Sequence, residues 1–434
     1  MTDARAIAFY LPQFHPVPQN DAWWGSGFTE WTNVARATPR FDGHYQPHLP
    51  SELGYYDLRV PEVRERQAQL ARTHGIEGFC YYHYWFRGQR VIDRVYTEVL
   101  RSGRPDFPFC LMWANESWTR VWDGGNHEVL VAQEYDRSDD DEHIRALIEA
   151  FADPRYIRVD GRPLFMIYRA QSLPDPKRTT DAWRKACVES GLPEPLLVKC
   201  DTYSDEVGPD AFGCDMAAQF LPHGVTERVP SRSVGHDFVF DYDAIVDTFL
   251  DQPATSWRQL STVFPGWDNS PRRADHPATI VENNTPEKYE RWLRGTIARD
   301  EQQGLEPIVF INAWNEWAEG AHLEPDARFG RGFLEATARV LLGHVPAVDA
   351  ARPTFDPPQD DTVAYADLYH RLYDEFVKLQ RFTTELLGTV ELRVRQGLAE
   401  HDALLRQSRH ESAELAAHLR RLQEELDSWR GTAQ

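Results

Sequence analysis

The sequence lacks several features that would place it in a common class of protein. It contains no run of about 18 apolar residues that would span a membrane, and no basic segment followed by an apolar stretch opens it. Its five cysteines form no CxxC pair, which argues against a zinc knuckle or a redox dithiol. They stand in apolar runs such as GFCYY and PFCLMW, which favours buried thiols. We therefore expect an unexported, cytoplasmic protein with no transmembrane segment.

Positive charge is also scarce. The chain has 47 Lys and Arg residues against 68 Asp and Glu residues, a formal net charge of −21. Because a surface that binds nucleic acid must neutralise phosphates, we expect no nucleic-acid partner. A glycine-rich phosphate-binding turn after an early strand is missing as well, which disfavours an open, doubly wound nucleotide-binding sheet.

Aromatic residues, in contrast, are abundant. They make up 12% of the chain and include 14 Trp, many of them beside Asn, Asp and Glu. Sugar rings pack their flat C–H faces on indoles, while their hydroxyls hydrogen-bond to amides and carboxylates. This composition favours a cleft for an oligosaccharide or polysaccharide substrate.

Eight short apolar runs alternate with helical stretches, which is the pattern of βα units around a parallel sheet. The runs are residues 6–11, 78–82, 109–113, 163–168, 196–200, 216–220, 261–264 and 307–311. Helices are expected at residues 60–73, 140–152, 180–190 and 286–300, the last with Thr285 as its cap. Eight alternations predict an α/β fold, a closed (β/α)8 TIM barrel.

The composition changes after the barrel, which is predicted to cover residues 1–347. Residues 348–361 are rich in proline and aspartate and are interpreted as a linker. Residues 362–434 are predicted to form a helical tail. Its leucines at Leu415, Leu419, Leu422 and Leu426 alternate in steps of four and three, as in a coiled coil that joins a second copy or a partner helix. A single amphipathic helix packed on the barrel is the alternative.

The catalytic groups of such a barrel come from the ends of its strands. Here the eighth run leads into NAWNEWAEG, which carries Glu316 and Glu319 three residues apart. On a turn, this spacing puts both carboxylates on one face. Paired carboxylates raise each other's pKa, so that one serves as an acid while the other stays ionised. An ExxE pair on a solvated helix is the alternative, but the two Trp residues beside it favour a catalytic site.

Further residues near the strand ends are candidates for binding the substrate. They are Tyr10, Gln13, Trp113, Asn115, Trp118, Trp267, Asp268, Asn269, Asn312, Trp314, Asn315 and Trp317. The aromatic members offer faces for sugar rings, and the polar members offer partners for hydroxyls. The alternatives are that the tryptophans fill the barrel mouth and that the polar side chains cap its turns.

No metal site is expected. His44 and His48 have a four-residue spacing, but Pro47 breaks the helix that such a pair would need. The acidic run from Asp139 follows Ser138 and precedes a helical pattern. We interpret it as an N-terminal helix cap whose charges match the helix dipole, and not as a motif that holds a metal and a nucleotide sugar.

Several blocks of the sequence resemble known enzymes. WNEWAEG followed by AHLEPD resembles the catalytic signature of glycoside hydrolase family 99, the endo-α-mannosidases and endo-α-mannanases. FYLPQFHP, WWGSGFTEWTNV, HGIEGFCYYHYWF, WANESWTRVWDG and FPGWDN resemble blocks of the related bacterial WbsX-type glycosyltransferases. The likeness covers roughly residues 4–345 and leaves the tail outside it.

The resemblance implies a retaining barrel enzyme that uses no metal or cofactor. By motif position, Glu316 would be the base for a sugar 2-hydroxyl, whose oxygen forms a 1,2-anhydro sugar. Glu319 would protonate the departing oxygen and then activate water. Ala318 stands where the hydrolases usually carry histidine, and the WbsX group is named for polysaccharide-biosynthesis clusters. A glycosyltransferase of polysaccharide or O-antigen biosynthesis, with a lipid-linked substrate, is therefore an alternative. A non-catalytic glycan-binding or scaffold protein is another.

Overall fold

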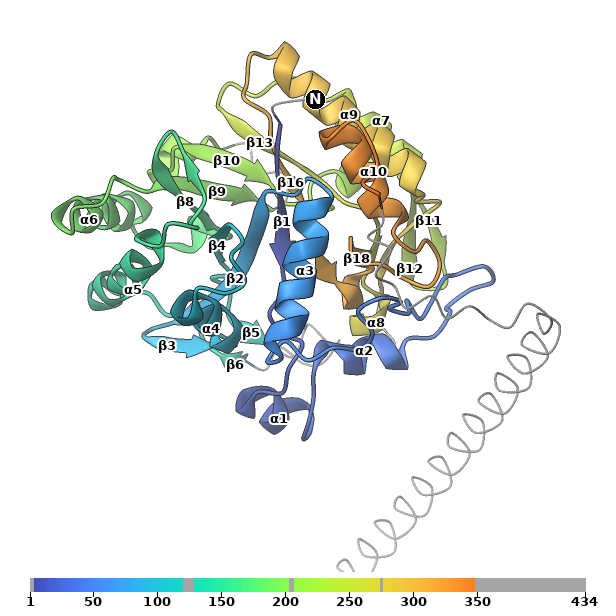
Figure 1. Ribbon diagram of the computed structural model, residues 1–434, viewed down its shortest axis with the longest axis horizontal. Helices are drawn as coiled ribbons and strands as arrows, with labels where there is room; N and C mark the ends of the chain where they lie inside the picture. The colour runs from blue at the N-terminus through green and yellow to red at the C-terminus, as the bar shows by residue number, and fades with distance from the viewer. Residues whose placement is uncertain (1–3, 120–128, 203–206, 274–275, 348–434) are drawn as a thin grey trace, which may run out of the picture. The chain divides into compact units, whose positions relative to one another are not determined.

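Eight parallel strands close into a barrel in the computed structural model, which describes residues 4–119, 129–202, 207–273 and 276–347 (Figure 1). The strands are β1 (Arg5–Tyr10), β2 (Gly78–Phe86), β4 (Phe109–Trp113), β8 (Arg162–Ile167), β9 (Leu196–Asp201), β10 (Met216–Gln219), β13 (Gln259–Val263) and β16 (Ile308–Ile311). The barrel closes at β1, where Ala6 pairs with Val309 of β16 and Ile7 pairs with Gly78 of β2. The predicted fold is confirmed, and each predicted apolar run lies on one of these strands.

Helices cover the outside of the barrel. They are α3 (Pro61–Thr73), α4 (Arg94–Ser102), α5 (Arg137–Phe151), α6 (Pro176–Glu189), α7 (Tyr242–Leu250), α9 (Pro286–Gln302) and α10 (Gly332–Leu341). Between β9 and β10 the described residues include a short 3-10 helix, η3 (Pro209–Phe212). Each helix buries one face against the strands, so the apolar residues of both layers form one continuous core.

Two helix starts test the predicted caps. The Thr285 hydroxyl accepts a hydrogen bond from the Lys288 backbone N–H, as expected for the cap of α9. Helix α5 begins earlier than predicted, because its cap is Asp136, whose carboxylate accepts from the Asp139 N–H at 2.9 Å. Ser138 therefore lies inside the first turn of α5, and the acidic residues after it match the positive end of the helix dipole.

The barrel interior is packed with side chains and is not a pore. All nine residues of β2 are buried, and Phe9 of β1 stacks on Phe310 of β16 with ring centroids 5.1 Å apart. All five cysteines are buried and free, as expected. A substrate cannot enter such a core, so binding is confined to the ends of the strands.

Short elements wall the end of the barrel where the strands finish. They are α1 (Pro18–Trp24), α2 (Glu30–Arg36), α8 (Ser270–Arg273), β5 (Trp118–Thr119), β6 (Val129–Val131), β14 (Trp267–Asp268), β15 (Thr279–Glu282), β17 (Asn315–Glu316) and β18 (Ala321–His322). Figure 1 shows α1, α2 and α8 gathered at this end. Two antiparallel strands, β11 (Ser231–Val234) and β12 (Asp237–Asp241), extend the sheet of β15 and β14. Strands β3 (Gln89–Val91) and β7 (Arg158–Val159) add hairpins to β2 and β8.

The chain was also predicted to have no transmembrane segment and to continue beyond the barrel as a linker and a helical tail. Within the described part of the chain, every helix is too short or too polar to cross a membrane. Contacts divide the chain into one unit of Met1–Ala347 and another of Val348–Gln434. The predicted linker and coiled-coil tail lie outside the described residues, so both stay predictions.

Candidate active site

The two candidate catalytic carboxylates lie on a tight hairpin after β16. Strands β17 and β18 pair through Glu316 and Ala321, and the 3-10 turn η5 (Trp317–Glu319) joins them. Gly320 ends this turn with φ of 62°, and a Cβ there would lie 2.9 Å from the Asp268 backbone nitrogen. Only glycine fits that backbone and that space, so the sequence after ExxE permits the hairpin to close.

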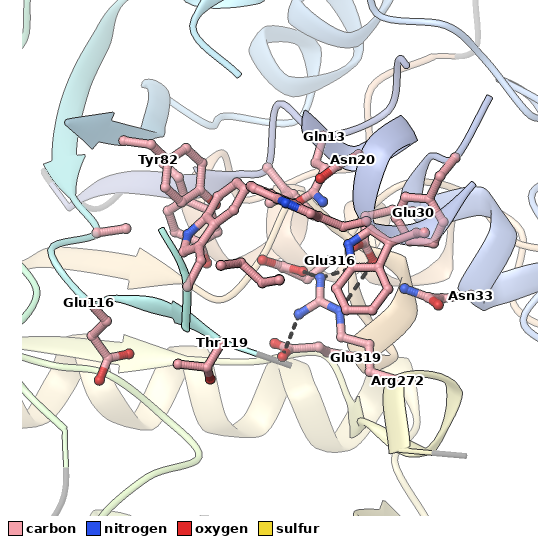
Figure 2. Close-up of a pocket in the computed structure, with 18 of the residues that line it drawn as sticks. Gln13, Asn20, Glu30, Asn33, Tyr82, Glu116, Thr119, Arg272, Glu316 and Glu319 are labelled. Carbon is pink, nitrogen blue, oxygen red and sulfur yellow. Dashed lines mark hydrogen bonds and ion pairs between the residues drawn. The ribbon is translucent and has the colours of Figure 1, made fainter. Parts of the chain in front are cut away.

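One guanidinium binds both carboxylates. Arg272 of α8 donates to Glu319 Oε1 at 2.7 Å and to Glu316 Oε2 at 2.9 Å, and also donates to Glu30 Oε2 of α2 at 3.1 Å. Figure 2 shows the Glu316 and Glu319 side chains converging on this guanidinium. The arginine side chain is only 14% exposed, so these ion pairs are shielded from water. The ExxE residues therefore face the same side of the turn and not the bulk solvent.

Burial makes this cluster retain protons. It raises the pKa of Glu316 to about 8, while the Arg272 guanidinium opposes that shift and the Glu319 and Glu30 carboxylates add to it. Burial also raises the pKa of Glu319, again against the pull of Arg272. Glu316 and Glu319 therefore cannot both ionise in this dry site without a large cost in free energy, because the two share a single guanidinium. Near neutral pH the pair therefore holds a proton that can be given to a reacting group.

A cavity of about 270 Å³ opens in front of the two carboxylates. Much of its wall is aromatic, with Trp118 making edge contacts to Trp23 at 5.7 Å and to Tyr84 at 5.1 Å. The other aromatic residues of this wall are Trp24, Phe28, Tyr82, Tyr168, Phe220 and Trp267. Gln13, Asn20 and Asn33 add amide groups (Figure 2). Such a wall suits the mixed apolar and polar faces of a sugar.

A second cavity, of about 470 Å³, adjoins the first. The two share Trp267, Arg272 and Glu319 among their lining residues, so Glu319 lies where they meet. The second cavity is more polar, and its lining includes Asn115, Glu116, Ser117, Gln133, Arg169, Asn269 and Arg273. A chain of sugars could occupy both cavities with one linkage beside Glu319.

Several predicted binding residues reach these cavities. Gln13, Trp118 and Trp267 line the aromatic cavity, and Asn115 and Asn269 line the polar one. Asn115 is held by the Tyr135 hydroxyl and by the Arg169 backbone, so only part of its amide is available.

Asp268 lines a third cavity, of about 130 Å³, away from the carboxylate pair. Its carboxylate accepts a hydrogen bond from Gln46 and lies 2.7 Å from His44 Nε2. The partner of His48 is instead His322. The two histidines that are four apart in sequence therefore do not bind a common group.

Six predicted binding residues lie outside the cavities described and hold the scaffold. Five of them hydrogen-bond to other buried groups, and Trp314 packs on Phe79. The bonds join Tyr10 to the Gln67 side chain, Trp113 to the Trp85 carbonyl, Asn312 to the Leu221 carbonyl, Asn315 to both backbone groups of Leu11, and Trp317 to the Glu324 side chain. The contacts of the three tryptophans agree with the alternative in which tryptophans fill the barrel mouth, and those of Asn312 and Asn315 with the alternative in which polar side chains bind the backbone of the turns. The reason is that adjacent strand-end residues point to opposite sides, so only some of them face the cleft.

Arg272 and Glu30 are two site residues that were not predicted from the sequence. Both stand in or beside distinctive blocks, since Glu30 lies in WWGSGFTEWTNV and Arg272 follows FPGWDN by three residues. Glu30 and Arg272 are 242 residues apart in the sequence, and Arg272 and Glu316 are 44 residues apart. No local spacing signals a pairing of that kind.

A family model described as "Glycosyltransferase WbsX" matches residues 6–337 of the chain. The chain is also 43% identical over 406 residues to "Uncharacterized protein WxcX" of Xanthomonas campestris pv. campestris strain B100. It is 42% identical to the protein of the same description from another strain. In both cases the match covers 90% of this chain but 57% of the relative, so the chain spans little more than half of their length.

Two solved structures share the barrel. One is described as a glycoside hydrolase-like protein and superposes with a TM-score of 0.51 at 15% identity, covering 79% of this chain and 94% of that protein. The other is the glycoside hydrolase family 99 endo-α-mannosidase from Bacteroides thetaiotaomicron, with a TM-score of 0.50 at 14% identity and coverage of 79% and 97%. At such low identity these likenesses show the fold alone.

Proposed function

The chain belongs to the WbsX glycosyltransferase family, and from this premise we propose that it cleaves or forms glycosidic bonds with Glu316 and Glu319 as its acid–base pair. The observation that carries the proposal is the placement of both carboxylates on one guanidinium, at the junction of an aromatic and a polar cavity. Neither carboxylate caps a helix through its side chain or forms an ion pair on the protein surface.

The proposed reaction has two steps. In the first, Glu316 accepts the proton of a sugar 2-hydroxyl, the 2-oxygen bonds to the anomeric carbon, and the departing oxygen takes a proton from Glu319. In the second, Glu319 takes a proton from water or from an acceptor hydroxyl, whose oxygen opens the 1,2-anhydro ring, and Glu316 returns its proton to the 2-oxygen. Two inversions give net retention, and each carboxylate handles one proton.

The raised pKa values of Glu316 and Glu319 support a pair of carboxylates that shares a proton. The raised pKa of Glu316 favours its neutral form at rest, whereas the proposed base must be ionised when the 2-hydroxyl reacts. Arg272 lowers the pKa of both carboxylates; its Nη1 donates to Glu319, and its Nη2 donates to Glu316 and also lies 3.1 Å from Glu30 Oε2. We propose that the pair holds one proton and that a bound substrate, by placing its leaving oxygen beside Glu319, draws the proton there.

The 1,2-anhydro route also restricts the substrate. The 2-hydroxyl must lie trans to the leaving group, which confines the substrate to manno-like or similarly configured sugars. The aromatic wall around Trp118 would stack one sugar, and the polar cavity would bind the hydroxyls of its neighbour.

Glycosyl transfer to a growing polysaccharide or lipid-linked acceptor is the second candidate, and the description of the family favours it. The same two carboxylates serve either outcome, because only the acceptor in the second step differs. Incubation with α-manno-configured oligosaccharides separates the candidates, since new reducing ends indicate hydrolysis. Label that moves only from an activated sugar donor to an acceptor indicates transfer.

The roles of the two carboxylates are tested with leaving groups. With a glycosyl fluoride, which departs without a proton, Glu319→Gln should recover the first step, whereas Glu316→Gln should stay inactive because no base reaches the 2-hydroxyl. Glu62→Gln, an exposed site in the first turn of α3, is the matched control and should behave as the unmodified protein. Full activity of Glu319→Gln on natural linkages would refute the proposal, and rescue of Glu316→Gln alone would exchange the two roles.

A further inference from the structure

Three side chains meet in the third cavity, apart from the carboxylate pair; His322 and Asp326 are buried and His48 is half-buried. His48 comes from the connection between α2 and α3, His322 is on β18, and Asp326 follows it by four residues. One potential ligand atom from each of these residues lies within 4.8 Å of the other two. In sequence His48 and His322 are 274 positions apart, so the fold alone brings them together.

The orientation of His322 is set by the backbone. Its Nδ1 lies 3.1 Å from the carbonyl oxygen of Glu324, which can only accept, so Nδ1 carries the proton. The lone pair of Nε2 is therefore directed at His48, whose Nδ1 is 2.8 Å away. In most metal-binding histidines, the ring nitrogen that does not bind the metal donates its hydrogen to a carbonyl or carboxylate oxygen, which fixes the tautomer.

The remaining donors complete a mixed set. Asp326 Oδ1 accepts a hydrogen bond from the Phe329 backbone N–H at 2.6 Å, and this bond orients the carboxylate. Two imidazole nitrogens and one carboxylate oxygen, with a further position open to water, match the preference of zinc and similar divalent transition ions.

We propose that His48, His322 and Asp326 bind one divalent transition-metal ion of the zinc class. Binding shifts the proton of His48 from Nδ1 to Nε2, so that both facing nitrogens offer lone pairs and no proton is gained or lost. Two nitrogens on one zinc ion lie about 3.3 Å apart, so the rings must separate by about 0.5 Å. The cavity beside them, of about 130 Å³, leaves space for the ion and its water.

The other charges around the cavity permit a cation. Asp268 faces it with a carboxylate that accepts from Gln46 and binds His44. Among the residues that line the cavity, the one Lys or Arg is Arg328, which is exposed and whose guanidinium stacks over the rings of Tyr45 at 4.7 Å and Phe329 at 4.8 Å. The side chain of Arg328 can turn to water, so its charge does not close the site.

The ion would act as a clamp beside the catalytic hairpin, and it takes no part in the proposed reaction. The ring of His322 stacks on Trp317 with centroids 3.8 Å apart, and Trp317 stands between Glu316 and Glu319. A metal bond to His48 would therefore tie the first connection of the barrel to the turn that carries both carboxylates.

The test uses the full chain after treatment with a chelator and dialysis. Titration with Zn²⁺ by calorimetry, and with Co²⁺ by its visible absorption, should show one site that is lost or weakened at least about 10–100-fold in His48→Gln and Asp326→Asn. Asp326→Asn keeps the oxygen that accepts from Phe329, and far-ultraviolet circular dichroism checks its folding. His344→Gln, an exposed histidine, is the control for adventitious binding and should retain the site.

Two results would overturn the proposal. One is the absence of a Zn²⁺ site in the unmodified chain. The other is equal stoichiometry and affinity in the unmodified chain, Asp326→Asn and His344→Gln, which would leave His48 and His322 as a plain hydrogen-bonded pair. Because binding is measured without substrate, neither result depends on whether the proposed reaction is correct.

Discussion

Replacing Arg272 by methionine tests the electrostatics of the site most directly. The change keeps a long apolar stem but removes the guanidinium that contacts Glu30, Glu316 and Glu319 at 2.7–3.1 Å. Removing one partner of a buried ion pair lowers the free energy of unfolding by about 3–5 kcal/mol. At pH 7 we therefore expect the variant to lose about that much.

The loss in free energy of unfolding should be larger at pH 7 than at pH 5, because the number of protons bound to the folded cluster changes. The unmodified folded cluster already holds one proton near neutral pH. Without the guanidinium we expect the folded cluster to hold at least one proton more than that, on a carboxyl that is ionised in the unfolded chain, where the pKa of glutamate is about 4.3. The free energy of unfolding then falls by about 1.36 kcal/mol for each pH unit and each extra proton held in the folded state. Between pH 5 and pH 7 this amounts to about 2.7 kcal/mol, so the loss at pH 5 should be only about 0–2 kcal/mol.

The assay is urea unfolding followed by tryptophan fluorescence at pH 5 and pH 7. The matched control is Arg291→Met, because Arg291 also binds two carboxylates, Asp243 and Asp247, but its side chain is 47% exposed. Water screens that pair, so the control should stay close to the unmodified protein at both pH values. An equal loss at pH 5 and pH 7, or a loss no larger than that of the control, would refute the reasoning.

Four further outcomes are expected. The pKa of Glu316 in the folded protein is about 8, so its stabilising contribution is fully present below about pH 4.3 and is lost as the pH rises through 8. The thermal midpoint of Glu316→Gln should therefore rise relative to that of the unmodified protein from pH 5 to pH 8. Parallel curves of midpoint against pH would contradict this. Trp118→Ala should raise KM more than it lowers kcat in an oligosaccharide assay, because stacking acts on binding. Trp292→Ala should lower the free energy of unfolding by about 3–5 kcal/mol, since its indole is fully buried, and urea titration measures the loss. A chain that ends at Asp361 should show a smaller mass by light scattering than the full chain if the tail is a coiled coil.

Local sequence patterns were sufficient to predict the barrel and the position of the acidic pair along it. Apolar runs and the Thr285 cap act through neighbouring residues, so their spacing was sufficient to predict all eight strands and the start of α9. The facing of Glu316 and Glu319 also follows from a local turn, which Gly320 closes.

The groups that surround that pair depend on long-range packing. Glu30 and Arg272 come from other connections of the barrel, and His48 hydrogen-bonds to His322 and not to His44. The partner of a buried polar group depends on which loops meet at the strand ends. In the same way the closed barrel, and not residue type, directed Trp118 into the cleft and Trp113 into the core. Local spacing sets backbone conformation, whereas long-range packing sets the partners of each charge and so the protonation of the site.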